Sequence, residues 1–105
     1  MQTKDLNKHV IFDQLQNNSE IIRSFGISKI GLFGSYVRNE ANDHSDIDFI
    51  VEFKPERKTY RNFMKLVSFL KTLFHDRIDV LTDKSLSPHI GPHILKEVEY
   101  VAFND

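Results

Sequence analysis

Two aspartates one residue apart, Asp46 and Asp48, open the most apolar run of the sequence, DIDFIVEF. Alternation along a strand places both aspartates on one face, while Ile47 and Phe49 point to the other. Carboxylates held this close repel one another unless something offsets their charge. Whatever fold contains this strand must therefore also provide a partner for the acidic pair.

A third aspartate extends the pair. On a strand with a rise of roughly 3.3 Å per residue, the Cα atoms of Asp46 and Asp48 lie about 6–7 Å apart. Asp79 lies in the middle of another predicted strand, residues 77–82, and completes the set if the two strands are neighbours. A divalent cation would remove the repulsion between three carboxylates. All-oxygen ligands favour Mg²⁺ or Mn²⁺ over zinc.

The Gly34-Ser35 turn lies shortly before the acidic pair. Glycine permits a close backbone approach and unusual φ angles. Ser35, at the start of a short helix expected over residues 36–41, would offer amide donors, a hydroxyl and the positive end of the helix dipole to an anion. Arg38 lies one helical turn further, on roughly the same side. The turn is therefore a candidate phosphate site beside the candidate metal site.

The other segments predict an α/β (α+β) fold. Apolar spacing indicates two consecutive helices within residues 3–25, with Ser19 as the cap of the second. A long amphipathic helix is expected over residues 59–75, and a short helix that runs into an extended end over residues 94–101. With strands over residues 27–33, 46–53 and 77–82 and a loop at 42–45, these form a small mixed sheet with helices packed on one face. A length of 105 residues fits a single domain, residues 1–105.

Composition narrows the class of protein. No run is apolar enough to span a membrane, and no signal peptide follows Met1, so we expect a cytoplasmic protein. The absence of cysteine agrees with a reducing compartment. A net charge of −1 argues against direct nucleic-acid binding. Half of the 14 Lys and Arg residues lie between Lys54 and Arg77, either as a solvated helix face or as a patch that contacts a partner or a triphosphate.

The spacing of the motifs resembles that of a known superfamily. Gly34-Ser35, ten further residues and then Asp46-Ile47-Asp48 are similar to the signature of the DNA polymerase β-like nucleotidyltransferases. The similarity is closest to the minimal nucleotidyltransferases of prokaryotes. It covers nearly the whole chain, including GLFGSYVRNEA, SDIDFIVEF, the long helix and RIDVLT.

The resemblance implies roles for individual residues. Asp46 and Asp48 would hold a pair of Mg²⁺ ions, with Asp79 as the third carboxylate. Gly34 and Ser35 would hold the β- and γ-phosphates of the nucleotide. In addition, Arg38 matches an arginine that often follows the Gly-Ser pair, whereas Asn39 stands where relatives often carry glycine.

The resemblance also implies a reaction and a partner. An acceptor hydroxyl would attack the α-phosphorus of ATP, with Asp79 as the candidate that takes the hydroxyl proton. Minimal nucleotidyltransferases are often antitoxins that silence a HEPN-domain ribonuclease toxin by AMPylation of a tyrosine. We therefore expect ATP as substrate and a HEPN-domain toxin as partner. The small chain leaves little room for an acceptor pocket of its own.

Two alternatives remain open at the level of sequence. The chain could be a non-catalytic antitoxin that acts on its partner by contact, or a nucleotidyltransferase for a small acceptor such as an aminoglycoside. A sheet edge that is exposed would also allow a homo-oligomer.

Overall fold

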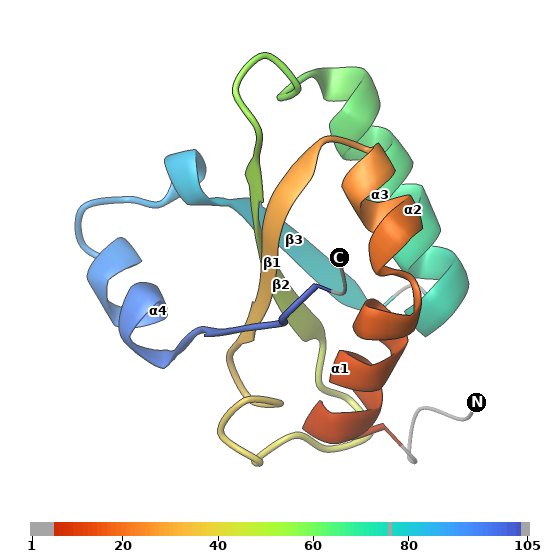
Figure 1. The fold of residues 1–105 in the computed structure, drawn as a ribbon. Helices are drawn as coiled ribbons and strands as arrows, with labels where there is room; N and C mark the ends of the chain where they lie inside the picture. The colour runs from red at the N-terminus through yellow and green to blue at the C-terminus, as the bar shows by residue number, and fades with distance from the viewer. Residues whose placement is uncertain (1–5, 76, 104–105) are drawn as a thin grey trace.

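The computed structural model describes residues 6–75 and 77–103. Its centre is a four-stranded sheet in the order β3-β2-β1-β4, which Figure 1 shows between two helical layers. The strands are β1 (Ile27–Phe33), β2 (Ile47–Phe53), β3 (Ile78–Thr82) and β4 (Glu99–Tyr100). β1 pairs antiparallel with β2 and β4, whereas β2 and β3 are parallel. The predicted small mixed sheet is thus confirmed.

The parallel pair β2 and β3 is joined by the longest helix, α3 (Tyr60–Phe74). Thr59 caps this helix, because its Oγ1 accepts the Asn62 N–H at 3.1 Å. The apolar stripe on α3 is buried at Leu66 and Leu70, as the amphipathic pattern predicted. The helix therefore forms the crossover connection that parallel neighbouring strands require.

The N-terminal helices are α1 (Lys8–Asn17) and α2 (Ser19–Ser24). Residues 3–5 of the predicted helical segment lie outside the described residues. Asn7 caps α1 through a bond from the Val10 N–H. The prediction that Ser19 caps α2 is wrong: Ser19 is the buried first residue of that helix, and Asn18 precedes it without a side-chain cap bond. The Asn18 side chain instead donates to the Gln14 carbonyl at 2.8 Å and closes α1.

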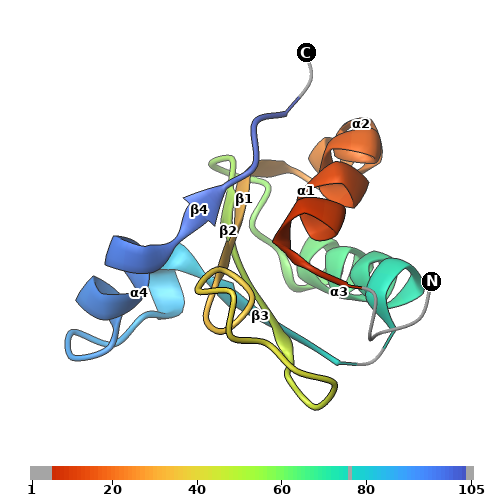
Figure 2. The same cartoon turned by 90° about the horizontal axis from the view of Figure 1, so that it is seen from below.

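The helices form two layers of unequal size. α1, α2 and α3 lie together on one face of the sheet, while the short helix α4 (Gly91–Glu97) lies on the other side (Figure 2). Ile94 of α4 forms a second buried cluster with Phe33 and Ile50. The sequence predicted helices on one face, and the three longer helices follow that prediction. The short helix α4 was also predicted, but it lies on the opposite face and brings the C-terminal segment to the side that carries the aspartates.

The extended end predicted after this helix forms the edge strand β4, where Tyr100 pairs with Gly31. Among the described residues, no helix combines the length and the apolar character needed to cross a bilayer.

Candidate active site

Asp48 lies at the centre of the candidate site. It is the second residue of β2, where it pairs with Asp79 across the parallel ladder and with Phe33 across the antiparallel one. The condition set by the sequence, that the strands of these two aspartates be neighbours, is therefore met. Asp46 lies just before β2 rather than within it and is exposed.

The surroundings of Asp48 disfavour its ionised form. The side chain is half-buried, and this burial is the largest cause that raises the pKa of Asp48 from 3.8 to about 6. Three neighbouring carboxylates add to the effect: Asp79, Asp46 and Glu97. The guanidinium of Arg38 opposes it. The site thus contains more negative charge than the protein alone compensates.

Gly34 joins the turn to the aspartates. Its φ angle of +81° is left-handed, and a Cβ at this position would overlap the Asp48 Oδ2. Only glycine satisfies both conditions, because it tolerates a positive φ and leaves room for the carboxylate. The turn and the acidic pair, predicted as two halves of one site, therefore meet at Gly34 and Asp48. Their roles in phosphate and metal binding stay predictions.

The segment after Ser35 differs from the prediction. We expected a short helix over residues 36–41, but this segment forms an irregular turn. The Arg38 N–H donates to the Gly34 carbonyl at 3.2 Å, and Asn39 then takes a left-handed φ of 61°. A helix cannot continue through this conformation. A helix dipole consequently plays no part in the candidate phosphate site. The donors of this site are the local backbone N–H groups and the Arg38 guanidinium.

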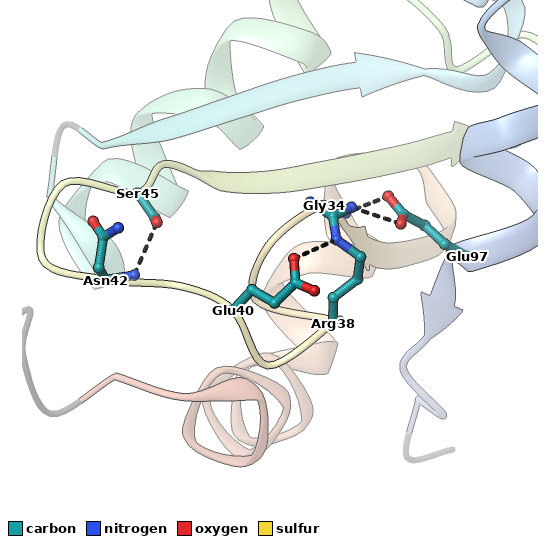
Figure 3. A network of polar contacts seen from close by, with 6 residues as sticks. All are labelled: Gly34, Arg38, Glu40, Asn42, Ser45 and Glu97. Atoms are coloured by element: carbon teal, nitrogen blue, oxygen red, sulfur yellow. Dashed lines mark hydrogen bonds and ion pairs between the residues drawn. The ribbon is translucent and has the colours of Figure 1, made fainter.

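Sequence reasoning missed Glu97, at the end of α4. Its carboxylate accepts the Gly34 N–H at 2.7 Å and Arg38 Nη1 at 2.8 Å, as Figure 3 shows. Arg38 Nε also donates to Glu40 at 3.1 Å. Burial raises the pKa of Glu97, but the bonds from Arg38 and Gly34 outweigh it, so that this pKa lies below its usual value. No local pattern marked Glu97, because its contacts span about sixty residues of sequence.

The loop before Asp46 has the turn chemistry that its composition predicted. Asn42 N–H donates to Ser45 Oγ at 2.9 Å, which is visible in Figure 3. The His44 N–H donates to Asn42 Oδ1 at 2.8 Å. Asparagine and serine commonly close turns in this way. The loop thereby places Asp46 directly before the first residue of β2.

The donor set fits a hard divalent cation in its chemistry, since all candidate ligands are carboxylate oxygens at one end of two neighbouring strands. Within residues 6–75 and 77–103, however, no three acidic or histidine side chains are gathered closely enough to form a ready-made cluster. Mutual repulsion of the carboxylates gives a physical reason for this spread. The residues present are therefore compatible with a metal that draws them together.

The basic span from Lys54 to Arg77 begins at the other end of the sheet. Lys54 directly follows β2 and lies six positions after Asp48, which corresponds to roughly 20 Å along a strand. Arg57 here has a structural contact, because its Nη2 donates to the Ser24 carbonyl at 2.9 Å. This placement does not support contact between the beginning of the span and a triphosphate at Gly34.

Comparison with known proteins bears on the family of this chain. The sequence profile of the nucleotidyltransferase domain family matches residues 15–101. Protein adenylyltransferase MntA from Thermococcus cleftensis is 39% identical over 85 residues, which cover 81% of this chain and 85% of the relative.

Two solved structures have the same fold. One, of a candidate minimal nucleotidyltransferase, superposes with a TM-score of 0.77 at 24% identity and covers 90% of this chain and 96% of the other. The other is a chain from the complex of a tri-AMPylated Shewanella oneidensis HEPN toxin with an MNT antitoxin. It superposes with a TM-score of 0.60 at 18% identity and covers 89% of this chain and 73% of the other. Family match, sequence identity and fold agree, and the chain belongs to the nucleotidyltransferase domain family, in the group of minimal nucleotidyltransferases that includes MntA.

Proposed function

We propose that this chain is a protein adenylyltransferase that transfers AMP from ATP to a tyrosine hydroxyl of a HEPN-domain toxin and so acts as an antitoxin. The observation that carries the proposal is the position of Asp48, which pairs with Asp79 on one side and contacts Gly34 on the other. Nucleotidyl transfer needs metal-binding carboxylates beside a phosphate-binding backbone. The 39% identity with a protein adenylyltransferase supports the choice of reaction.

The phosphates would bind at the turn. We call the Gly34 N–H and the Arg38 guanidinium the triphosphate subsite; Ser35, the next residue of the turn, would add its hydroxyl. Two donors of this kind suit the β- and γ-phosphates, because guanidinium and amide groups bind phosphate oxygens through charge-assisted hydrogen bonds. In the transition state the same donors would stabilise the charge that develops on the leaving pyrophosphate.

The three aspartates would hold two divalent cations, Mg²⁺ or Mn²⁺. Bound there, the cations would neutralise charge on the attacking and leaving oxygens. The acceptor oxygen forms a bond to the α-phosphorus while the bond to the bridging oxygen breaks, and pyrophosphate leaves. Asp79 is the group we expect to take the acceptor proton, since it is exposed on the outer strand beside Asp48.

A partner protein would supply the acceptor. Asp46 and Asp79 are both exposed, so that a hydroxyl carried by another macromolecule can approach them. The complex of a HEPN toxin with an MNT antitoxin of the same fold supports this kind of partner. The basic residues at the far end of β2 remain available for contact with such a partner.

The test is transfer of label from ATP. The protein is incubated with Mg²⁺, a HEPN-domain protein encoded beside it and ATP labelled at the α-phosphate. We expect label on the partner with wild type, none with the double variant Asp46→Ala/Asp48→Ala, and unchanged labelling with Asp13→Ala, an exposed aspartate on α1. ATP labelled at the γ-phosphate should leave no label, because pyrophosphate departs.

The same assay separates the alternatives. If the partner stays unlabelled but is still inhibited by both wild type and the double variant, the chain acts by contact and the proposal is wrong. Label that appears on an added aminoglycoside but never on the partner would instead indicate a small-molecule acceptor.

A further inference from the structure

Glu97 occupies both donors of the triphosphate subsite. Its Oε2 accepts the Gly34 N–H at 2.7 Å, and its Oε1 accepts Arg38 Nη1 at 2.8 Å. The two oxygens of one carboxylate thus bridge a backbone amide and a guanidinium (Figure 3). Oxygens of a phosphate group make the same pair of contacts in proteins that bind nucleotides.

The carboxylate is ionised when it makes these contacts. Although partial burial works against the charged form, the bonds from Arg38 and Gly34 lower the pKa of Glu97. Its negative charge also faces Asp48, whose pKa it helps to raise. A triphosphate that approached the same donors would meet an anion already bound there and further acidic groups behind it.

Glu97 reaches the subsite from a separate part of the fold. It ends α4, a helix of seven residues, and α4 is attached to the sheet through Ile94 and its cluster with Phe33 and Ile50. Arg38 is therefore bound by a carboxylate from the C-terminal segment and by Glu40 from its own turn. Of these two acids, only Glu97 also takes the backbone amide of Gly34.

We propose that Glu97 is a further residue of the nucleotide site, which binds the Gly34 amide and the Arg38 guanidinium in place of phosphate oxygens until the triphosphate displaces it. The inference rests on the proposed function. It makes Glu97 a determinant of nucleotide affinity: the residue keeps the donors arranged in the empty protein and competes with the substrate for them.

The test is a binding titration with the full chain and no acceptor. The probes are inorganic tripolyphosphate and a non-hydrolysable ATP analogue, the latter with Mg²⁺. Glu97→Gln keeps the shape of the side chain but removes its charge. Its control is Glu99→Gln, which makes the same change two residues away, where Glu99 pairs with Lys8 at 3.0 Å.

We expect Glu97→Gln to bind both probes about tenfold more tightly than wild type, equivalent to about 1.4 kcal/mol. The affinity of Glu99→Gln for both probes should stay within about twofold of wild type, because a surface ion pair contributes little. Equal or weaker binding by Glu97→Gln, with wild type still binding the analogue, would overturn the inference alone. No binding of the analogue by wild type or variant would overturn the proposed function together with it.

A measurement on wild type covers the case in which the variant does not fold. The amide proton of Gly34 donates to a carboxylate in the empty protein, which gives it a distinct resonance. Addition of tripolyphosphate should shift this resonance and the side-chain carboxyl signal of Glu97 in the same titration. A Gly34 shift with an unchanged Glu97 signal would show that the carboxylate is not displaced and would contradict the proposal.

Discussion

Replacement of Asp48 by asparagine should make the empty protein more stable at neutral pH. The folded structure holds the Asp48 carboxyl half-buried and close to other carboxylates, and its pKa is raised from 3.8 to about 6. Below pH 3.8 the group is protonated in both the folded and the unfolded chain. As the pH rises, the unfolded chain ionises first, so the stability that the protonated form provides is lost as the pH passes through 6.

The size of the effect follows from the shift. At 1.36 kcal/mol per pKa unit, the change corresponds to about 3 kcal/mol as an upper limit. Because the side chain is only half-buried, screening by solvent reduces this to about 1–2 kcal/mol at pH 7.5. The stability gained by Asp48→Asn should fall to less than half of that value at pH 4.5, because Asp48 is protonated in folded wild type at this pH.

The assay is urea denaturation of wild type and Asp48→Asn at both pH values, in the presence of a metal chelator. Asp13→Asn, an exposed change on α1, serves as the control and should stay within about 0.5 kcal/mol. Addition of Mg²⁺ at pH 7.5 should stabilise wild type but not the variant. A variant that is less stable than wild type in chelator at pH 7.5 would refute the reasoning.

Three further changes test other parts of the site. Gly34→Ala should lower the free energy of unfolding by at least about 1–2 kcal/mol, because the residue has a positive φ and a Cβ would overlap a neighbouring carboxylate. The variant should also lose AMP transfer, and full activity would contradict the account of the turn. Asp79→Asn should slow AMP transfer roughly 10²–10⁴-fold while the affinity for an ATP analogue changes little, as initial rates and titration would show. Asn39→Gly should leave thermal stability almost unchanged, whereas Asn39→Val should cost about 1–2 kcal/mol because valine tolerates a left-handed φ poorly.

Local sequence patterns predicted those helices and strands whose buried face follows the spacing of apolar residues. The apolar stripe of α3 and the alternation of β2 predicted both elements, whereas only the structure shows that β2 and β3 form a parallel pair. That pair sets Asp48 beside Asp79. The turn was predicted beside the acidic pair, and the antiparallel pairing of β1 with β2 in the structure places Gly34 near Asp48.

The rest depended on contacts that no local pattern encodes. Glu97 meets Gly34 only because α4 packs on the face opposite to the longer helices, and such packing is decided by tertiary structure. The turn after Ser35 fails to become a helix because Asn39 accepts a left-handed conformation. Ser19 is buried rather than a cap, since Asn18 uses its side chain to close the preceding helix.

The central claim is that the Gly34 turn and the three aspartates form one nucleotide site. A crystal structure with Mg²⁺ and a non-hydrolysable ATP analogue tests it most directly. We predict phosphate oxygens on the Gly34 N–H and on Arg38, Glu97 turned away from both, and metal bound by Asp46 and Asp48. A nucleotide bound elsewhere, or phosphates at the turn with no metal on these aspartates, would contradict the account.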